Sequence, residues 1–289
     1  MNRKGIILAG GLGTRLLPIT KVISKQLLPV YDKPMIYYPL ATLMTAGIKE
    51  ILIITNPQDK ELFKKLLGNG RQWGIKICFE EQKKPRGIAE ALIIAEKFLD
   101  KHPSALILGD NIFYSKLTSD LLSMDNYKNS HATIFSYEVK DPKRYGVVEI
   151  DAKNIILSIE EKPKIPKSLL AVTGLYLYDS QAPDLCKKLK PSKRGELEIT
   201  DLNNIYLEKG ELSNVYLDKS FLWLDSGTFD SLIQASNFVC ESQKKHNTII
   251  ACPEEISYKK GWIDIKMIKS LIKENDNSLG EYLSKVLLN

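Results

Sequence analysis

Short apolar runs alternate with longer amphipathic stretches from residue 5 to residue 108. The apolar runs predict buried strands over 5–9, 50–55, 75–79 and 105–108. The stretches between them predict helices over 35–46, 60–67 and 88–99. Strand and helix alternating at this spacing are typical of a parallel sheet that helices cover on both faces.

The pattern changes after Asp110, where strands follow one another without long helices. Strands are predicted over 132–138, 147–150, 155–160 and 170–178, with a hairpin turn at 151–154. From Thr228 onward the chain is mostly helical, and Pro253 and Gly261 are expected to interrupt the helices. The expected fold class is therefore α/β: a Rossmann-like, mostly parallel mixed sheet with helices on both faces, a small β subregion and a helical C-terminal part. No linker divides it, so 1–289 is predicted to be a single domain.

Composition excludes several classes of protein. Hydrophobic residues make up 44% and charged residues 26%, which is ordinary for a globular chain and excludes a disordered or collagen-like one. Forty-one basic residues against 35 acidic ones leave a net charge of +6 over 289 residues. So mild a bias suits a small anionic ligand better than a nucleic acid. The four cysteines lack metal-ligand spacing, and no run is long enough for a signal peptide or a membrane span, so we expect a cytoplasmic protein with no membrane partner.

A glycine-rich loop follows the first predicted strand. Gly10, Gly11 and Gly13 leave backbone N–H groups open to a phosphate, and Thr14 and Arg15 follow them directly. The loop does not fit a dinucleotide fingerprint, because a leucine stands where the last glycine should be, and it lacks the Lys-Ser/Thr ending of a Walker loop. Taken alone, it fits an ordinary turn with a surface arginine equally well.

Three further charged residues support the hypothesis that the loop binds a phosphate. Lys25 lies downstream of the loop, in a polar segment with Gln26, and can supply a second cation to the same phosphates. Asp110 follows a predicted buried strand, and Asp225 follows the apolar pair at 223–224. Carboxylates at strand ends are the oxygen ligands that Mg²⁺ prefers. For a single aspartate in such a place, however, a turn or helix-capping role is the commoner one.

The chain resembles the sugar-phosphate nucleotidyltransferases, and within them the thymidylyl-transferring branch. The resemblance rests on an ordered series of motifs that runs nearly from end to end. These motifs are Gly10-Gly11-x-Gly13-Thr14-Arg15-Leu16-x-Pro18 followed by Lys25, Gln82-x-x-Pro85-x-Gly87-Ile88-Ala89, Leu108-Gly109-Asp110-Asn111-Ile112-Phe113-Tyr114, Arg144-Tyr145-Gly146-Val147-Val148, Glu160-Glu161-Lys162-Pro163, Thr173-Gly174-Leu175-Tyr176, Arg194-Gly195-Glu196-Leu197-Glu198-Ile199-Thr200-Asp201 and Trp223-Leu224-Asp225-x-Gly227.

The resemblance implies an enzyme whose substrates are dTTP and glucose 1-phosphate and whose products are dTDP-glucose and pyrophosphate. The sugar phosphate attacks the α-phosphorus of the triphosphate, and it needs no general base because it is already ionised at neutral pH. The resemblance divides the chain into a nucleotide-binding half (about 1–115), a sugar-binding half (about 116–228) and a helical extension (about 229–289). It also implies a homo-oligomer, often a tetramer, with feedback by a deoxysugar nucleotide such as one of the rhamnose pathway.

The resemblance assigns roles to individual residues. Arg15 is expected to bind the departing phosphates, Lys25 the phosphate being transferred, and Asp110 and Asp225 a Mg²⁺ ion. The remaining residues fall into a nucleotide group (Gly10, Gly11, Gly13, Thr14, Gln26, Gln82, Gly87 and Asp110) and a sugar-phosphate group (Tyr145, Gly146, Glu161, Lys162, Val172 and Arg194).

Alternatives remain open at this stage. UTP could replace dTTP, because no motif tests directly for the thymine methyl group. A metal-dependent glycosyltransferase would want Asp-x-Asp, whereas Asp110 is followed by Asn111, and a nucleotide sensor without activity would have lost one of the charged residues. The segment Asp225-Ser226-Gly227-Thr228-Phe229 also departs from the Asp-Thr-Gly-Thr-His of the branch, with an effect that the sequence does not predict.

Overall fold

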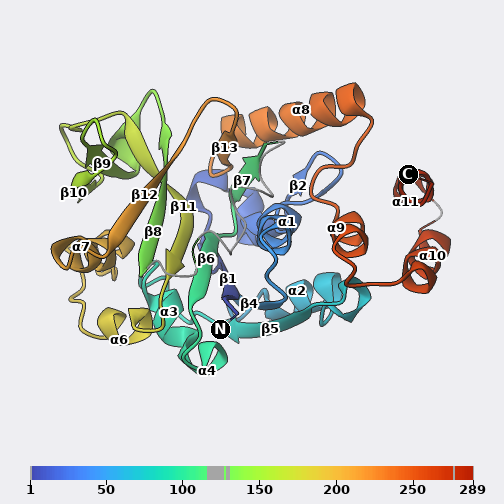
Figure 1. The fold of residues 1–289 in the computed structure, drawn as a ribbon, viewed down its shortest axis with the longest axis horizontal. Coiled ribbons are helices and arrows are strands. Elements are labelled where there is room, and N and C mark those ends of the chain that lie inside the picture. Colours follow the sequence, from blue (N-terminus) through green and yellow to red (C-terminus); the bar gives the residue numbers. More distant parts are fainter. Residues whose placement is uncertain (1, 116–126, 128–130, 276, 289) are drawn as a thin grey trace.

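In the computed structural model, which describes residues 2–115, 127, 131–275 and 277–288, one large mixed sheet runs through the molecule (Figure 1). Its strand order is β10-β9-β11-β6-β1-β4-β5, while β8 pairs with β11 and β12 pairs with β8. The strands of this sheet are β1 (Lys4–Ala9), β4 (Glu50–Thr55), β5 (Lys76–Glu81), β6 (Ser104–Leu108), β8 (Ala132–Glu138), β9 (Gly146–Ile150), β10 (Ile156–Glu161), β11 (Leu170–Tyr178) and β12 (Leu212–Leu217).

The half of the sheet formed by β6, β1, β4 and β5 is parallel. Isoleucines 7, 51, 53 and 107 point to one face of it, while Ile6, Leu52, Ile54 and Leu106 point to the other. Both faces are buried, which is why these strands are nearly continuous apolar runs. The expected mostly parallel sheet is confirmed.

Helices cover both faces of the sheet. The first face packs on α1 (Tyr37–Thr45) and α2 (Lys60–Leu67). The second face packs on α3 (Glu90–Ile94), α4 (Glu96–Leu99), α6 (Ala182–Cys186) and α7 (Ile199–Glu208). The helix expected over 88–99 is therefore two short helices that meet at Ala95, and α6 and α7 are additions to the sequence prediction.

The other half of the sheet is mixed: β11 is antiparallel to β6, β8 and β9, whereas β12 is parallel to β8. The β9–β10 hairpin turns through Asn154, whose φ is 63°, and the Asp151 carboxylate accepts backbone N–H bonds from Lys153 and Ile155. The turn predicted at 151–154 is thus confirmed. The expected division at 115–116 borders residues 116–126, which lie outside the described part of the chain.

Two small sheets lie beside the large one. Strands β7 (Asn111–Tyr114) and β13 (Leu222–Asp225) form an antiparallel ladder, and β2 (Pro29–Val30) pairs with β3 (Lys33–Pro34). The first ladder joins residues more than one hundred positions apart, since Asn111 pairs with Asp225.

The C-terminal part is helical, as expected: in Figure 1 its first helix runs along the top from beside β13 and β7, and its last three helices lie beyond β2 and α1, on the side away from β9 and β10. It consists of α8 (Phe229–His246), α9 (Pro253–Lys259), α10 (Ile265–Glu274) and α11 (Ser278–Val286). Pro253 and Gly261 lie at breaks between helices, as expected: Pro253 is the first residue of α9, where its missing N–H costs no hydrogen bond, and Gly261 follows the end of α9 with a φ of 66°. No helix among the described residues is long and apolar enough to cross a membrane.

Candidate active site

A cavity of about 810 Å³ lies beyond the carboxyl ends of β1 and β6, where ligands bind in open α/β sheets. Residues from both predicted halves of the chain line it. The predicted site residues among them are Gly11, Gly13, Thr14, Arg15, Lys25, Asp110, Tyr145, Gly146, Glu161, Lys162, Val172 and Asp225.

The glycine-rich loop forms one wall of this cavity. Gly13 has a φ of 62°, which an L side chain rarely adopts, and its carbonyl accepts a 2.8 Å hydrogen bond from the Thr20 hydroxyl. The chain then enters a short 3₁₀ turn, Thr14–Leu16, which buries Leu16 and leaves the Arg15 side chain 50% exposed. A methyl group at Gly227 would meet the end of the flexible Arg15 side chain, so the guanidinium lies directly against a glycine more than two hundred residues away.

Lys25 and Asp110 form an ion pair inside the cavity. The Lys25 ammonium donates to Asp110 Oδ2, and both side chains are about nine-tenths buried. Burial raises the pKa of the Asp110 carboxyl, but the Lys25 charge and the bonds from Lys25 and Asn111 outweigh it, so the pKa lies below its usual value. Asp110 is therefore held ionised.

Asn111 fixes Asp110 from the other side. Its side-chain oxygen accepts bonds from the Gly174 backbone N–H at 3.0 Å and from the Trp223 indole N–H at 2.6 Å. These two donors orient the amide, which donates to Asp110 Oδ1 at 3.1 Å. The three strands β7, β11 and β13 thus meet at one buried amide that positions the carboxylate.

Asp225 lies next to Asp110, because the Ser226 backbone N–H donates to the Asp110 carbonyl at 3.1 Å. Arg144 and Arg15 approach the same oxygen, Asp225 Oδ2, at 3.7 Å and 4.0 Å. Burial and the negative charge of Asp110 nevertheless raise the pKa of the Asp225 carboxyl above its usual value. The two carboxylates thus repel one another across the ladder of β7 and β13.

The acid pair has the chemistry of a magnesium site. Two carboxylates that destabilise each other's charge would be stabilised by a cation between them. Among the described residues no group of three or more histidines, cysteines or carboxylates is placed to hold a metal. A magnesium ion does not need a third protein ligand, because it commonly binds through one or two carboxylates and takes its other ligands from water and substrate phosphates. Asp110 and Asp225 therefore fit the metal.

The opposite wall carries the predicted sugar residues. Glu161 Oε2 accepts a 2.6 Å bond from the Thr200 hydroxyl, and the Lys162 ammonium lies 3.7 Å from Glu161 Oε1. A Cβ on Gly146 would lie 3.5 Å from Glu161 and 3.8 Å from Val172, so these residues share one pocket wall. A carboxylate that is one quarter exposed, beside a lysine, suits a ligand that has both hydroxyl and phosphate groups.

Arg194 is outside the cavity lining but touches this wall. Its guanidinium donates to both oxygens of Glu198 at 2.9 Å and lies 3.3 Å from Glu196 and 3.6 Å from Glu161. Three carboxylates therefore share the guanidinium that was predicted to contact a phosphate, and in this structure its hydrogen bonds go to Glu198.

The predicted base-binding residues lie together behind the loop. The Gln82 amide nitrogen donates to the Gly87 carbonyl at 3.1 Å and to Glu90 at 2.9 Å, while its oxygen faces Gly10. Gly87 has a φ of 103°, and a side chain there would collide with the Leu197 backbone. With both amide hydrogens engaged, Gln82 presents its oxygen as an acceptor.

Gln26 is also outside the cavity lining. It is 1% exposed, accepts a 2.7 Å bond from the Ser24 hydroxyl and lies close to Gly109. In this structure the Gln26 side chain packs beneath the loop, against Gly109 at the end of β6.

Some cavity residues have no role in the sequence prediction. Arg144, Asn111 and Thr200 line the cavity and contact a predicted site residue directly. Arg144 and Asn111 stand inside quoted motifs, next to Tyr145 and Asp110, and that adjacency was the available signal. Thr200 also stands inside a quoted motif, 194–201, whose second half forms the start of α7.

The departures at 226 and 229 occupy two different environments. Ser226 is fully buried, and its hydroxyl has no hydrogen-bond partner among the described residues. Phe229 is 41% exposed at the first position of α8, where Thr228 caps the helix by accepting a 3.2 Å bond from the Ser231 backbone N–H. Phe229 is therefore not among the cavity-lining residues.

At the carboxyl edge of an α/β sheet, one cavity brings together a glycine-rich loop with Arg15, the acid pair of Asp110 and Asp225, and a pocket wall with Glu161 and Lys162. Residues 4–242 match the family model described as nucleotidyl transferase, and the chain belongs to this family. Among curated relatives, it is similar to proteins named glucose-1-phosphate thymidylyltransferase from Xanthomonas campestris pv. campestris (51% identity over 284 residues, 98% of this chain and 96% of that protein) and Neisseria meningitidis (52% over 285 residues, 98% and 99%).

Solved structures of nucleotidyltransferases are also similar to this chain. A putative glucose-1-phosphate thymidylyltransferase from Bacillus anthracis, in complex with a sucrose, is 45% identical with a TM-score of 0.75, over 82% of this chain and 95% of that one. A UDP-glucose pyrophosphorylase complexed with UDP-glucose is 27% identical with a TM-score of 0.73, over 84% and 100%.

Proposed function

We propose that this enzyme transfers a thymidylyl group from dTTP to glucose 1-phosphate, releasing pyrophosphate and dTDP-glucose. The observation that carries the proposal is the single cavity in which Arg15, Lys25 and the acid pair face Glu161 and Lys162. The names of relatives at about half identity over nearly the whole chain support the choice of substrates.

The chemistry requires charge neutralisation more than proton transfer. An oxygen of the sugar phosphate forms a bond to the α-phosphorus of dTTP, and the bond from that phosphorus to the bridging oxygen of the β-phosphate breaks. The attacking phosphate is ionised at neutral pH, so no base has to remove a proton. No histidine lines the cavity within the described residues, which suits such a reaction. Positioning and electrostatic stabilisation then supply most of the rate.

Each charged residue has a place in this scheme. Arg15 binds the β- and γ-phosphates that leave together, and Lys25 contacts the phosphate being transferred. Lys162 binds the phosphate of the sugar. Asp110 and Asp225 would hold Mg²⁺, which supplies positive charge to the phosphate oxygens as negative charge accumulates on them.

The Gln82 amide supports part of the choice of base. Both of its hydrogens are engaged and its oxygen is left as an acceptor; thymine, uracil and guanine carry a ring N–H that can donate to such an oxygen, whereas cytosine and adenine do not. The preference for thymine over uracil is supported by the relatives, since the pyrophosphorylase for UDP-glucose is less similar than the thymidylyltransferases.

A panel of triphosphates tests this function. We expect glucose 1-phosphate and Mg²⁺ to yield pyrophosphate with dTTP at the highest kcat/KM, with UTP below it and with dCTP and ATP far below both. Pyrophosphate release by a coupled assay is the measurement. Absence of turnover with dTTP would refute the proposal, and a higher kcat/KM with UTP would transfer it to uridylyl chemistry.

Substitution Arg15→Ala tests the role of the loop arginine. We expect kcat to fall by about 100- to 1000-fold, because the guanidinium stabilises charge that develops on the leaving group, with little change in KM for glucose 1-phosphate. Steady-state kinetics measure both constants. Arg71→Ala, an exposed arginine in the 3₁₀ turn 71–73 before β5, is the matched control and should keep wild-type values. A change confined to KM would assign Arg15 to ground-state binding instead.

The same proposal includes three further expectations. We expect the protein to form a homo-oligomer, with a tetramer as the family form, to be regulated by a deoxysugar nucleotide, and to act in the cytoplasm.

A further inference from the structure

Arg144 is a second guanidinium at the acid pair, and it comes from the sugar-side half of the chain. It ends the 3₁₀ turn 142–144 that precedes β9, whereas Arg15 lies in the turn that follows β1. Both arginines approach one oxygen, Asp225 Oδ2, at 3.7 Å and 4.0 Å. The two halves of the chain therefore each contribute one arginine near Asp225 Oδ2.

Asp225 does not use up the hydrogen-bond donors of either arginine. Charge-assisted hydrogen bonds between nitrogen and a carboxylate measure about 2.7–2.9 Å, and both contacts are longer. Among the described residues no hydrogen bond from either guanidinium is present, although a guanidinium has five N–H donors. The two side chains are 42% and 50% exposed and line the cavity. They can accept a larger anion without losing an existing hydrogen bond.

Arg144 is held on a fixed aromatic platform. Its guanidinium carbon lies 5.6 Å from the centre of the Tyr145 ring, which packs edge-on against Trp223 at 5.2 Å. The Trp223 indole is bonded in turn to Asn111. An arginine stacked on such a base loses less side-chain freedom when it binds a ligand than a free surface arginine does.

Among the described residues, the cations that line the cavity are Arg15, Lys25, Lys143, Arg144 and Lys162. Lys162 lies 3.7 Å from Glu161 and Lys25 is paired with Asp110, while Arg15 and Arg144 both lie within 4.0 Å of Asp225. The reaction has two separate anions to hold, the sugar phosphate and the triphosphate. The grouping assigns Arg144 to the triphosphate, at the end that Arg15 binds.

We propose that Arg144 is a phosphate-binding residue that grips the departing pyrophosphate opposite Arg15, so that one arginine from each half of the chain encloses the leaving group. The proposal rests on the proposed function, since pyrophosphate is the leaving group of that reaction. Its test uses pyrophosphate alone and requires neither the base nor the sugar to be known.

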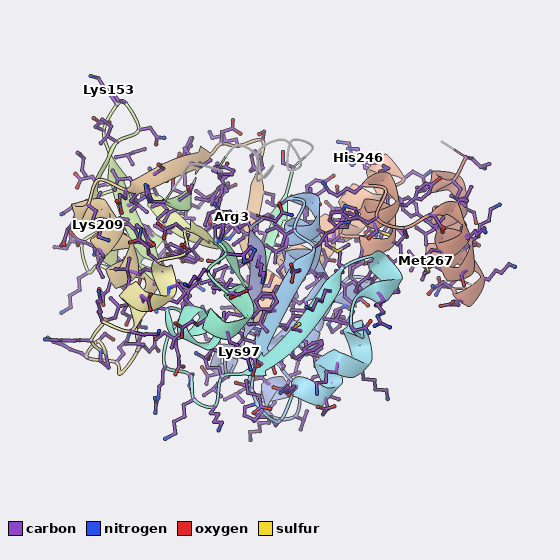
Figure 2. All side chains as sticks on the ribbon, turned by 60° about the horizontal axis from the view of Figure 1, so that its bottom comes forward. Arg3, Lys97, Lys153, Lys209, His246 and Met267 are labelled. Atoms are coloured by element: carbon purple, nitrogen blue, oxygen red, sulfur yellow. The ribbon has the colours of Figure 1, made fainter. Side chains whose placement is uncertain are left out.

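Calorimetric titration of the full-length protein with sodium pyrophosphate, without divalent metal, measures this contact directly. We expect Arg144→Ala to weaken binding about 10- to 100-fold, as for loss of a charged hydrogen-bond pair, and Arg144→Lys to fall between the two because it keeps the charge but not the fork. Lys153→Ala is the control for loss of one positive charge, since Figure 2 shows Lys153 at the outer end of the β9–β10 hairpin. It should bind as the wild type does.

A second comparison separates direct contact from an effect through Asp225. Arg144→Ala is measured again in an Asp225→Asn background, where the carboxylate charge is gone. If Arg144 touches pyrophosphate, the loss persists at about the same size. If it only neutralises Asp225, the loss disappears, and the proposal is overturned.

Other outcomes are equally decisive. No detectable binding of pyrophosphate by the wild-type protein, or a dissociation constant for Arg144→Ala within twofold of the wild-type value, overturns the proposal. Because the titration needs no turnover, a protein that loses pyrophosphate binding with Arg144→Ala but fails the triphosphate panel would refute the proposed function and keep the role of Arg144.

Discussion

Asp225→Asn is expected to reduce turnover by at least about 1000-fold while leaving the folded protein at least as stable as the wild type. The amide has the shape of the carboxylate but no charge, so it cannot serve as an anionic ligand for Mg²⁺. Backbone pairing between Asp225 and Asn111 does not depend on the side chain and is kept. Steady-state pyrophosphate release and urea unfolding are the two measurements.

The stability part follows from the sign of the pKa shift. The pKa of Asp225 is raised in the folded protein by burial and by Asp110, so its ionised form at neutral pH destabilises the fold. Removing that charge removes the penalty. Asp110→Asn is the opposite case, because the pKa of Asp110 is lowered and its ionised form stabilises the fold. Turnover of Asp225→Asn within tenfold of wild type would remove Asp225 from the metal site.

Asp218→Asn provides the control for loss of a carboxylate. Asp218 accepts bonds from the Ser220 backbone and hydroxyl in the exposed turn between β12 and β13, a few residues before the site. We expect wild-type turnover from this variant. A comparable loss there would mean that the β12–β13 connection, and not the charge at 225, limits the reaction.

Lys25→Met is expected to lower both turnover and stability. It leaves the buried Asp110 carboxylate without its cation, and breaking a buried ion pair on one side costs about 3–5 kcal/mol of unfolding free energy. Turnover should fall by at least about 1000-fold, because the contact to the transferred phosphate is lost together with the charge balance of the site. Urea unfolding and pyrophosphate release measure the two effects.

The double variant Lys25→Met/Asp110→Asn separates these effects. Replacing both charges leaves no unpaired ion, so most of the lost stability should return, whereas turnover should not. If Lys25→Met alone unfolds no more easily than the wild type, the buried pair contributes nothing to stability. If the double variant regains turnover, Lys25 acts only as a partner of Asp110 and does not contact the substrate.

Elements bounded by breakers were predicted well from the sequence. The strand 50–55, the helix 60–67 and the strand 170–178 have the predicted limits, because each is a buried or amphipathic run that ends at glycine or polar residues. The ladder of β7 and β13 was not predicted. Its two strands are four residues each and pair across more than one hundred residues, so no local pattern marks them.

The site, like the fold, has features that local motifs predicted and features that depend on residues far apart in the chain. The charged residues predicted from motifs, apart from Arg194, line one cavity, yet their partners could not be inferred from spacing. Arg15 lies against Gly227, Asp110 is oriented by Asn111 through Gly174 and Trp223, and Arg194 is shared by three carboxylates. Each of these relations depends on distances between residues far apart in the chain.

The order of residues alone determined the parallel half of the sheet, the glycine loop at its edge and the types of charged group that the site contains. These follow from local hydrophobic periodicity and from the backbone freedom of glycine. Only the folded chain decided which charges oppose one another: that Asp110 is ionised beside Lys25, that Asp225 sits against it at a raised pKa, and that Arg144 reaches Asp225 from the opposite half. The physical reason is that electrostatic energy depends on separation and burial, which topology sets when it brings β7 and β13 together.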